Sequence, residues 1–96
     1  MALPSWGQDT KLAQQYYVDG EYEKAAYYFQ RLYEARPNQD YYFNRYIDCL
    51  NALEQFGDSE KAIKKELKKS PEKIQLYVTL GNLYELQFMD TEAEEQ

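Results

Sequence analysis

The sequence predicts an all-helical fold built from repeated pairs of antiparallel helices, with five to six helices in total. Three observations support this. Identical residue types recur at one interval or at twice that interval, apolar residues recur at helical spacing between them, and glycine or proline stands at the joins. The coincidences pair Pro37 with Pro71 and, at twice the interval, Leu12 with Leu80, Tyr16 with Tyr84 and Ala25 with Ala93. We call the interval from Pro37 to Pro71 the period; it is about 34 residues, a length typical of repeats made of two helices.

The first helix pair is expected over about residues 9–18 and 21–35. We expect Asp9 to be the N-cap of the first helix, since its carboxylate can accept from first-turn amides. Gly20 ends that helix, because glycine adopts a positive φ at no steric cost. The small Ala25 on the second helix allows its partner helix to approach closely.

The second pair departs from the period. Gly57 and Ala62 lie three residues later than one period after Gly20 and Ala25, whereas Pro71 keeps the spacing. We therefore expect a longer first helix, about residues 40–56, and a shorter second helix, about residues 58–70. The longer helix carries an apolar stripe of Tyr42, Phe43, Tyr46, Ile47, Cys49, Leu50, Leu53 and Phe56, and the shorter one a stripe of Ala62, Ile63 and Leu67.

The third pair begins at Ser70-Pro71, which is expected to be an N-cap followed by a proline at the first helical position. Gly81 costs about 1 kcal/mol of helix propensity, which we expect close helix packing to offset. Phe88 stands where a turn glycine is expected. Either the chain turns there, with Thr91 and Glu94 as the capping box of a sixth helix, or the fifth helix runs on through Met89.

The first unit reads Leu12-Ala13-x-x-Tyr16, then Gly20-x-Tyr22-x-x-Ala25, Phe29, Leu32 and Pro37, and the third opens with Tyr77-x-x-Leu80-Gly81-x-x-Tyr84. This pattern resembles the tetratricopeptide repeat (TPR) family over about residues 9–96. The resemblance implies a right-handed α-solenoid of units at about 9–37, 38–71 and a truncated 72–96, after a leader of residues 1–8. It also implies a protein-binding or scaffolding module rather than an enzyme.

Composition excludes several function classes. The net charge of −6 argues against a phosphate-backbone binder, and hence against a nucleic-acid partner. No apolar run approaches the roughly 18 residues of a membrane span. A single cysteine and no histidine leave no ordinary zinc site and no histidine base, so we expect no metal, no cofactor and no enzymatic activity.

In the family, the first helix of each unit lines a concave face. Amide side chains there offer donors and acceptors, so they can bind the backbone of a peptide or partner helix of unidentified origin; the alternative is that they are only solvated. Some family members clamp chaperone tails with basic residues, but Thr10, Gln14, Gln75 and Thr79 stand at those positions here. The candidate peptide-binding residues are Lys11, Gln14, Asn44, Asp48, Asn51, Gln75, Thr79, Asn82 and Glu85.

Repeat arrays need a polar cap over their terminal apolar face. We see none after residue 88, and expect either a fragment of a longer array or a homo-oligomer formed through Leu86, Phe88 and Met89. A basic stripe precedes this end. It is either a solvated face or a site for an acidic partner, which can include the acidic segment 90–95, and it comprises Lys61, Lys64, Lys65, Lys68 and Lys69.

Five of the eleven tyrosines are expected in the helix seam, namely Tyr16, Tyr22, Tyr46, Tyr77 and Tyr84. Either Tyr27 or Tyr28, together with Tyr41, should be exposed, because adjacent pairs cannot both face the core. Cys49 is expected to be an inert buried thiol. Residues 2–8 resemble the tail of a secretory signal, which suggests an exported or periplasmic protein; a cytoplasmic one is the alternative.

Overall fold

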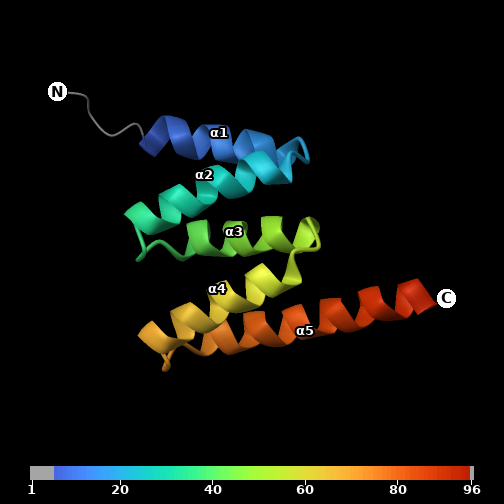
Figure 1. Ribbon diagram of the computed structural model, residues 1–96. Helices are drawn as coiled ribbons and strands as arrows, with labels where there is room; N and C mark the ends of the chain where they lie inside the picture. Colours follow the sequence, from blue (N-terminus) through green and yellow to red (C-terminus); the bar gives the residue numbers. More distant parts are fainter. Residues whose placement is uncertain (1–5, 96) are drawn as a thin grey trace. The chain divides into compact units, whose positions relative to one another are not determined.

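The computed structural model describes residues 6–95, which form five α-helices and no strand (Figure 1). The all-α prediction is therefore confirmed. The chain divides into two compact units, an N-terminal unit up to Glu54 and a C-terminal unit from Gln55. The helices are α1 (Trp6–Val18), α2 (Tyr22–Ala35), α3 (Asp40–Ala52), α4 (Phe56–Lys69) and α5 (Ile74–Glu95).

The helix bounds repeat with the same period as the sequence. Both ends of α3 lie one period after the ends of α1, both ends of α4 lie one period after those of α2, and α5 begins one period after α3. The three-residue shift expected in the middle pair is therefore wrong. The period that a few identical residues indicated is a property of the backbone as well.

The turn inside each pair explains this correction. Gly20 and Glu54, one period apart, both adopt a positive φ, of 77° and 59° respectively. Gly20 N donates to Tyr17 O at 3.1 Å, and Glu54 N donates to the equivalent Asn51 O at 3.0 Å. The turn that we expected at Gly57 therefore lies at Glu54, and Gly57 belongs to the first turn of α4.

The loops that follow α2 and α4 also match. Each begins with a backbone hydrogen bond back to the preceding helix and continues through a proline, Pro37 or Pro71. Ser70 is the C-cap that follows α4, and α5 begins at Ile74, so Ser70-Pro71 is not the helix start that we expected. The matching donor–acceptor pairs are Arg36 to Leu32 and Ser70 to Glu66, Gln39 to Arg36 and Lys73 to Ser70, and Tyr42 to Gln39 and Leu76 to Lys73.

In the N-terminal unit, α1 and α3 both pack against α2, which lies between them (Figure 1). Alanines at the centre let the helices approach closely, and half-buried tyrosine rings surround them. Each tyrosine can bury its ring while its hydroxyl reaches a polar partner. The buried cluster is Ala13, Ala25, Ala26, Phe29, Leu32 and Cys49, with Tyr16, Tyr17, Tyr22, Tyr28, Tyr42 and Tyr46 around it.

The start of α1 differs from expectation. The helix begins at Trp6, so residues 6–8, which we placed in a leader, are helical, and Asp9 lies in the first turn instead of capping it. A carboxylate there still favours the helix dipole. The rest of the suggested signal remnant, residues 2–5, lies outside the described residues.

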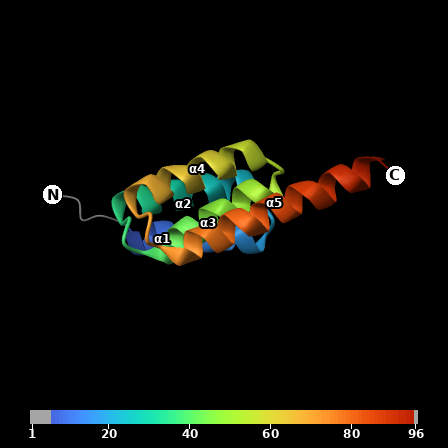
Figure 2. The ribbon, with the colours of Figure 1, turned by 90° about the horizontal axis from the view of Figure 1, so that it is seen from below.

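In the C-terminal unit, α4 packs against α5, and the buried residues of the two helices are Ser59, Ile63, Leu76 and Leu83. α5 is one continuous helix that extends well past α4 (Figures 1 and 2). The turn and capping box expected near Phe88 are therefore wrong, and the alternative of a helix through Met89 is confirmed. Thr91 Oγ1 donates to Gln87 O at 3.0 Å within the helix.

Two seam predictions in α5 are also wrong. Tyr77 and Tyr84 are largely exposed, unlike Tyr16, Tyr22 and Tyr46. Nothing lies within 4 Å of a Cβ built on Gly81, so the expected close packing around this glycine is missing.

Candidate functional site

All of the predicted concave-face residues lie on α1, α3 or α5, and none is buried. In the N-terminal unit, Lys11, Gln14 and Asn44 are exposed, whereas Asp48 and Asn51 are partly covered. In the C-terminal unit, the exposed members are Gln75, Asn82 and Glu85, and Thr79 is partly covered, its hydroxyl donating to Gln75 O at 2.9 Å.

Two side-chain hydrogen bonds join α1 to α3 directly. Gln14 Nε2 donates to Tyr41 Oη at 3.1 Å, and the hydroxyls of Thr10 and Tyr42 lie 3.0 Å apart. Because both tyrosines lie in the first turn of α3 and their partners lie one helical turn apart on α1, these bonds hold the two helices side by side. One surface thus carries side chains from two segments that are well separated in the sequence.

Arg45 lies at the centre of this surface. Its guanidinium carbon is 5.0 Å from the ring centroid of Tyr17 and 5.3 Å from that of Tyr41, so two aromatic rings flank the cation. Arg45 Nη1 also donates to Asp48 Oδ2 at 2.8 Å. We call this surface the α1–α3 face and define it by Gln14, Tyr17, Tyr41, Asn44, Arg45 and Asp48.

The α1–α3 face remains open to solvent although its side chains are held in place. The side chains of Arg45 and Asp48 are 37% and 45% exposed, and Tyr41 is 39% exposed. Burial, followed by the nearby Asp48 carboxylate, raises the pKa of Tyr17, which keeps this phenol neutral. The face therefore offers a fixed cation, a carboxylate, phenols and amides, in a defined geometry.

Sequence reasoning identified Gln14, Asn44, Asp48 and the exposed Tyr41, but it missed Arg45. Tyr41 and Arg45 stand at i and i+4 on one helix, and this spacing could have predicted the contact between their side chains. The contact with Tyr17 comes from another helix, so spacing along the chain does not indicate it.

A second aromatic cluster lies where α1 meets α2. As expected, one residue of the adjacent tyrosine pair is exposed, Tyr27 at 55%, whereas Tyr28 is partly buried and stacks on Tyr16 with centroids 5.8 Å apart. Arg31 Nη1 donates to Tyr27 Oη at 2.8 Å and lies over its ring. This arginine resembles Arg45 in its contacts but faces another side of the unit.

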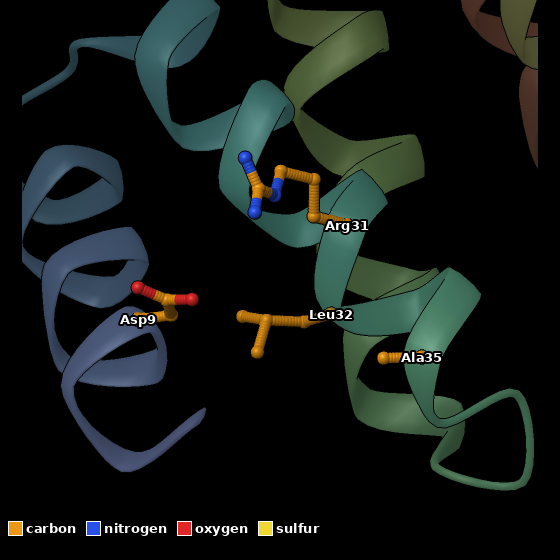
Figure 3. Close-up of a pocket in the computed structure, with 4 residues that line it drawn as sticks. All are labelled: Asp9, Arg31, Leu32 and Ala35. Atoms are coloured by element: carbon orange, nitrogen blue, oxygen red, sulfur yellow. The ribbon is translucent and has the colours of Figure 1, made fainter. Parts of the chain in front are cut away.

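A small hollow separates the start of α1 from the end of α2. Figure 3 shows Asp9 directed from α1 toward α2, where Arg31, Leu32 and Ala35 line the other side. Its volume is about 110 Å³. Ligand pockets for small molecules usually measure about 300–1,000 Å³, so this hollow is too small for one.

Cys49 is fully buried, as expected, and burial raises the pKa of its thiol to about 11. A thiol in this state is a poor nucleophile at neutral pH. Among residues 6–95, no group of three or more histidine, cysteine, aspartate or glutamate side chains is placed to hold a metal ion. No helix in this part of the chain has the length and apolarity to cross a membrane.

The basic stripe on α4 is partly neutralised. Lys64 lies 3.3 Å from Glu60, and Lys69 lies 3.5 Å from Glu66. Such exposed i, i+3 and i, i+4 pairs contribute little to stability, but they reduce the local positive charge that an acidic partner would meet.

A scan against protein-family models and searches of the curated proteins and of the solved structures find no match to this chain.

Proposed function

We propose that the protein is a non-enzymatic protein-interaction module of the tetratricopeptide type, and that its α1–α3 face binds an extended peptide segment of a partner protein. The observation that carries the proposal is the partly exposed Arg45, which is held close to two tyrosine rings on a face lined by amides. The common period of the helix bounds and of the loop hydrogen bonds supports the repeat assignment.

The chemistry of the face suits a peptide backbone. Gln14 and Asn44 each supply both donors and acceptors, which pair with backbone carbonyls and amides whatever the peptide sequence. Because its contacts already restrict the rotation of Arg45, a carboxylate or carbonyl that reaches it incurs a small ordering cost. Exposed tyrosine area such as that of Tyr41 adds rigid apolar contact.

The non-enzymatic part of the proposal rests on what the sequence provides for catalysis. The chain has no histidine, which is the commonest general base in enzymes. Its lone thiol, Cys49, is buried and has a raised pKa. We therefore propose that the fixed polar groups of the α1–α3 face bind a partner protein.

Selection of a random peptide library against the purified protein tests the proposal, with the affinity of selected peptides measured by calorimetry. Arg45→Ala should weaken binding by about tenfold or more, as expected for an anchoring arginine. Asn44→Ala, a change at an exposed position, should weaken it less.

Arg31→Ala is the matched control, because Arg31 also lies over a tyrosine ring and bonds a tyrosine hydroxyl, but outside the α1–α3 face. Circular dichroism of each variant verifies that it remains helical. Peptides that bind all three variants as tightly as the parent chain, or a failure to select any peptide, would contradict the proposal.

A further inference from the structure

α5 has a second apolar face opposite the one that packs on α4. Leu76 and Leu83 are buried, whereas the large apolar side chains half a helical turn away from them are 47–76% exposed. The exposed set recurs at i, i+3, i+4, i+7, i+14 and i+15, which places it on one side of the helix, where the exposed Glu85 at i+11 is the charged exception. We call this set the α5 stripe, and it comprises Ile74, Tyr77, Val78, Gly81, Phe88 and Met89.

The stripe contains two of the three residues that we expected in a homo-oligomer contact. Phe88 and Met89 are 63% and 60% exposed and belong to it. Leu86 is 43% exposed but lies on another side of α5. The sequence therefore indicated the end of this surface but not its extent along the helix.

The repeat shows that this side of a first helix is suited to packing against another helix. Gly81 stands two periods after Ala13, and Ala13 is fully buried in the core between α1 and α2. The equivalent side of α5 is exposed over most of its length. An α-helix is therefore the kind of structure that the α5 stripe accommodates.

Gly81 at the centre of the stripe has no role in the fold that we can identify. It lies in the interior of α5, where glycine costs about 1 kcal/mol relative to alanine. Nothing within 4 Å would meet a Cβ there, and its φ is not positive. A helix crossing at this point would explain the glycine, because a missing side chain lets two backbones approach closely.

The distribution of charge along the C-terminal unit favours a second copy of the chain as the partner, with its α5 antiparallel to the first. The connection between α4 and α5 carries Lys68, Lys69 and Lys73 beside Glu66 and Glu72 and so has a small net positive charge, whereas the acidic residues Asp90, Glu92 and Glu94 lie at the far end of α5. α5 has 22 residues against 14 in α4, so the acidic end projects by roughly 12 Å. A second copy in the antiparallel direction places each acidic end beside a basic end, whereas a parallel copy opposes like charges.

We propose that two copies of the chain associate through the α5 stripe as a symmetric antiparallel pair of helices that cross at Gly81. Around that centre, Ile74 of one copy lies beside Phe88 and Met89 of the other. This inference does not depend on the proposed peptide binding, which uses a different unit of the chain.

Sedimentation equilibrium on the full chain tests the association. The contact is one helix face per copy, so we expect a weak dimer with a dissociation constant on the order of 10–100 µM. Because the ends carry opposite charges, raising salt from about 0.05 to 0.5 M should weaken the dimer severalfold. A chain that remains monomeric up to several hundred micromolar at low salt overturns the proposal.

Substitutions locate the contact. Phe88→Asp should abolish the dimer, whereas Val18→Asp, a matched change at a 78% exposed position of α1, should leave it intact. Gly81→Ala separates folding from association. It should raise the melting temperature of the monomer, because alanine favours the helix, and weaken the dimer about tenfold, because the added Cβ would overpack the helix crossing. A dimer that survives both Phe88→Asp and Gly81→Ala lies elsewhere and overturns the proposal.

Oxidative cross-linking tests the direction. An equimolar mixture of Ile74→Cys and Met89→Cys chains should form a disulfide-linked dimer, and Ile74→Cys alone should form little. The buried native Cys49 should not compete. Preferential linkage of Ile74→Cys to itself would indicate parallel helices and overturn the antiparallel proposal.

Discussion

Glu54 and Gly57 show how single residues can hide a repeat. Gly57 looks like the counterpart of Gly20, but the residue one period after Gly20 is Glu54, which adopts the left-handed φ of 59° despite its Cβ. The same kind of replacement follows in the next helix, where the fully buried Ser59 and Ile63 stand one period after Ala25 and Phe29. A prediction based on matching glycines therefore put the turn at Gly57, three residues after its actual position at Glu54.

The left-handed turn at Glu54 predicts how two substitutions, Glu54→Gly and Gly57→Ala, change the free energy of unfolding. Glu54→Gly should raise the free energy of unfolding by about 1 kcal/mol, because it relieves a left-handed backbone at a residue with a Cβ. Gly57→Ala should also stabilise, by up to about 1 kcal/mol, because nothing crowds a Cβ at this helical position. Urea unfolding followed by circular dichroism measures both.

The Gly57→Ala result is the sharper of the two. If Gly57 occupied the turn, as residue identity indicates, alanine there would destabilise the protein. Gly20→Ala is the control, since it introduces a Cβ at a φ of 77° and should destabilise.

At the scale of elements, the helix content and about half of the helix bounds could be predicted, whereas the faces of α5 could not. No glycine or proline follows Gly81, and leucine, methionine and glutamate favour a helix, so α5 continues where a strict repeat would turn. The predicted seam residues Tyr77 and Tyr84 are exposed on this helix. The apolar spacing predicted which side of α5 is suited to packing, but it did not indicate whether another helix covers that side.

The contact between Tyr84 and Glu60 joins α5 to α4 and should make stability depend on pH. Tyr84 Oη donates to Glu60 Oε2 at 2.5 Å. This hydrogen bond, followed by Lys64, lowers the pKa of Glu60, and the same bond raises the pKa of Tyr84. A lowered carboxyl pKa stabilises the fold above the ordinary value of 4.5, and a raised phenol pKa stabilises it below 10.0.

Tyr84→Phe should therefore lower the melting temperature most between these two values, and the difference from the parent chain should shrink as the pH falls below 4.5. Tyr77→Phe is the control, because the Tyr77 hydroxyl donates to the carbonyl of Pro71, which does not titrate. Its effect should be the same at pH 3.5 and pH 7. A Tyr84→Phe difference that is also unchanged over this range would contradict the assigned contact.

At the scale of the whole molecule, the all-helical fold follows from the period and the apolar spacing, but the α1–α3 face follows only from the tertiary structure. The residues on it come from two helices that are far apart in the sequence, and each half alone resembles an ordinary solvated helix surface. Arg45 becomes a candidate only when Tyr17 is seen beside it. The amides Gln14 and Asn44 could be identified from their position on the first helix of each pair.

The most direct test of peptide recognition by the α1–α3 face is chemical-shift mapping by NMR, with a peptide selected from a random library titrated into the labelled protein. We expect the perturbed signals to cluster on Gln14, Tyr41, Asn44 and Arg45, and to vanish from the Arg45→Ala variant at the same peptide concentration. Perturbations centred on the exposed side of α2 around Tyr27, with none on the α1–α3 face, would contradict the account.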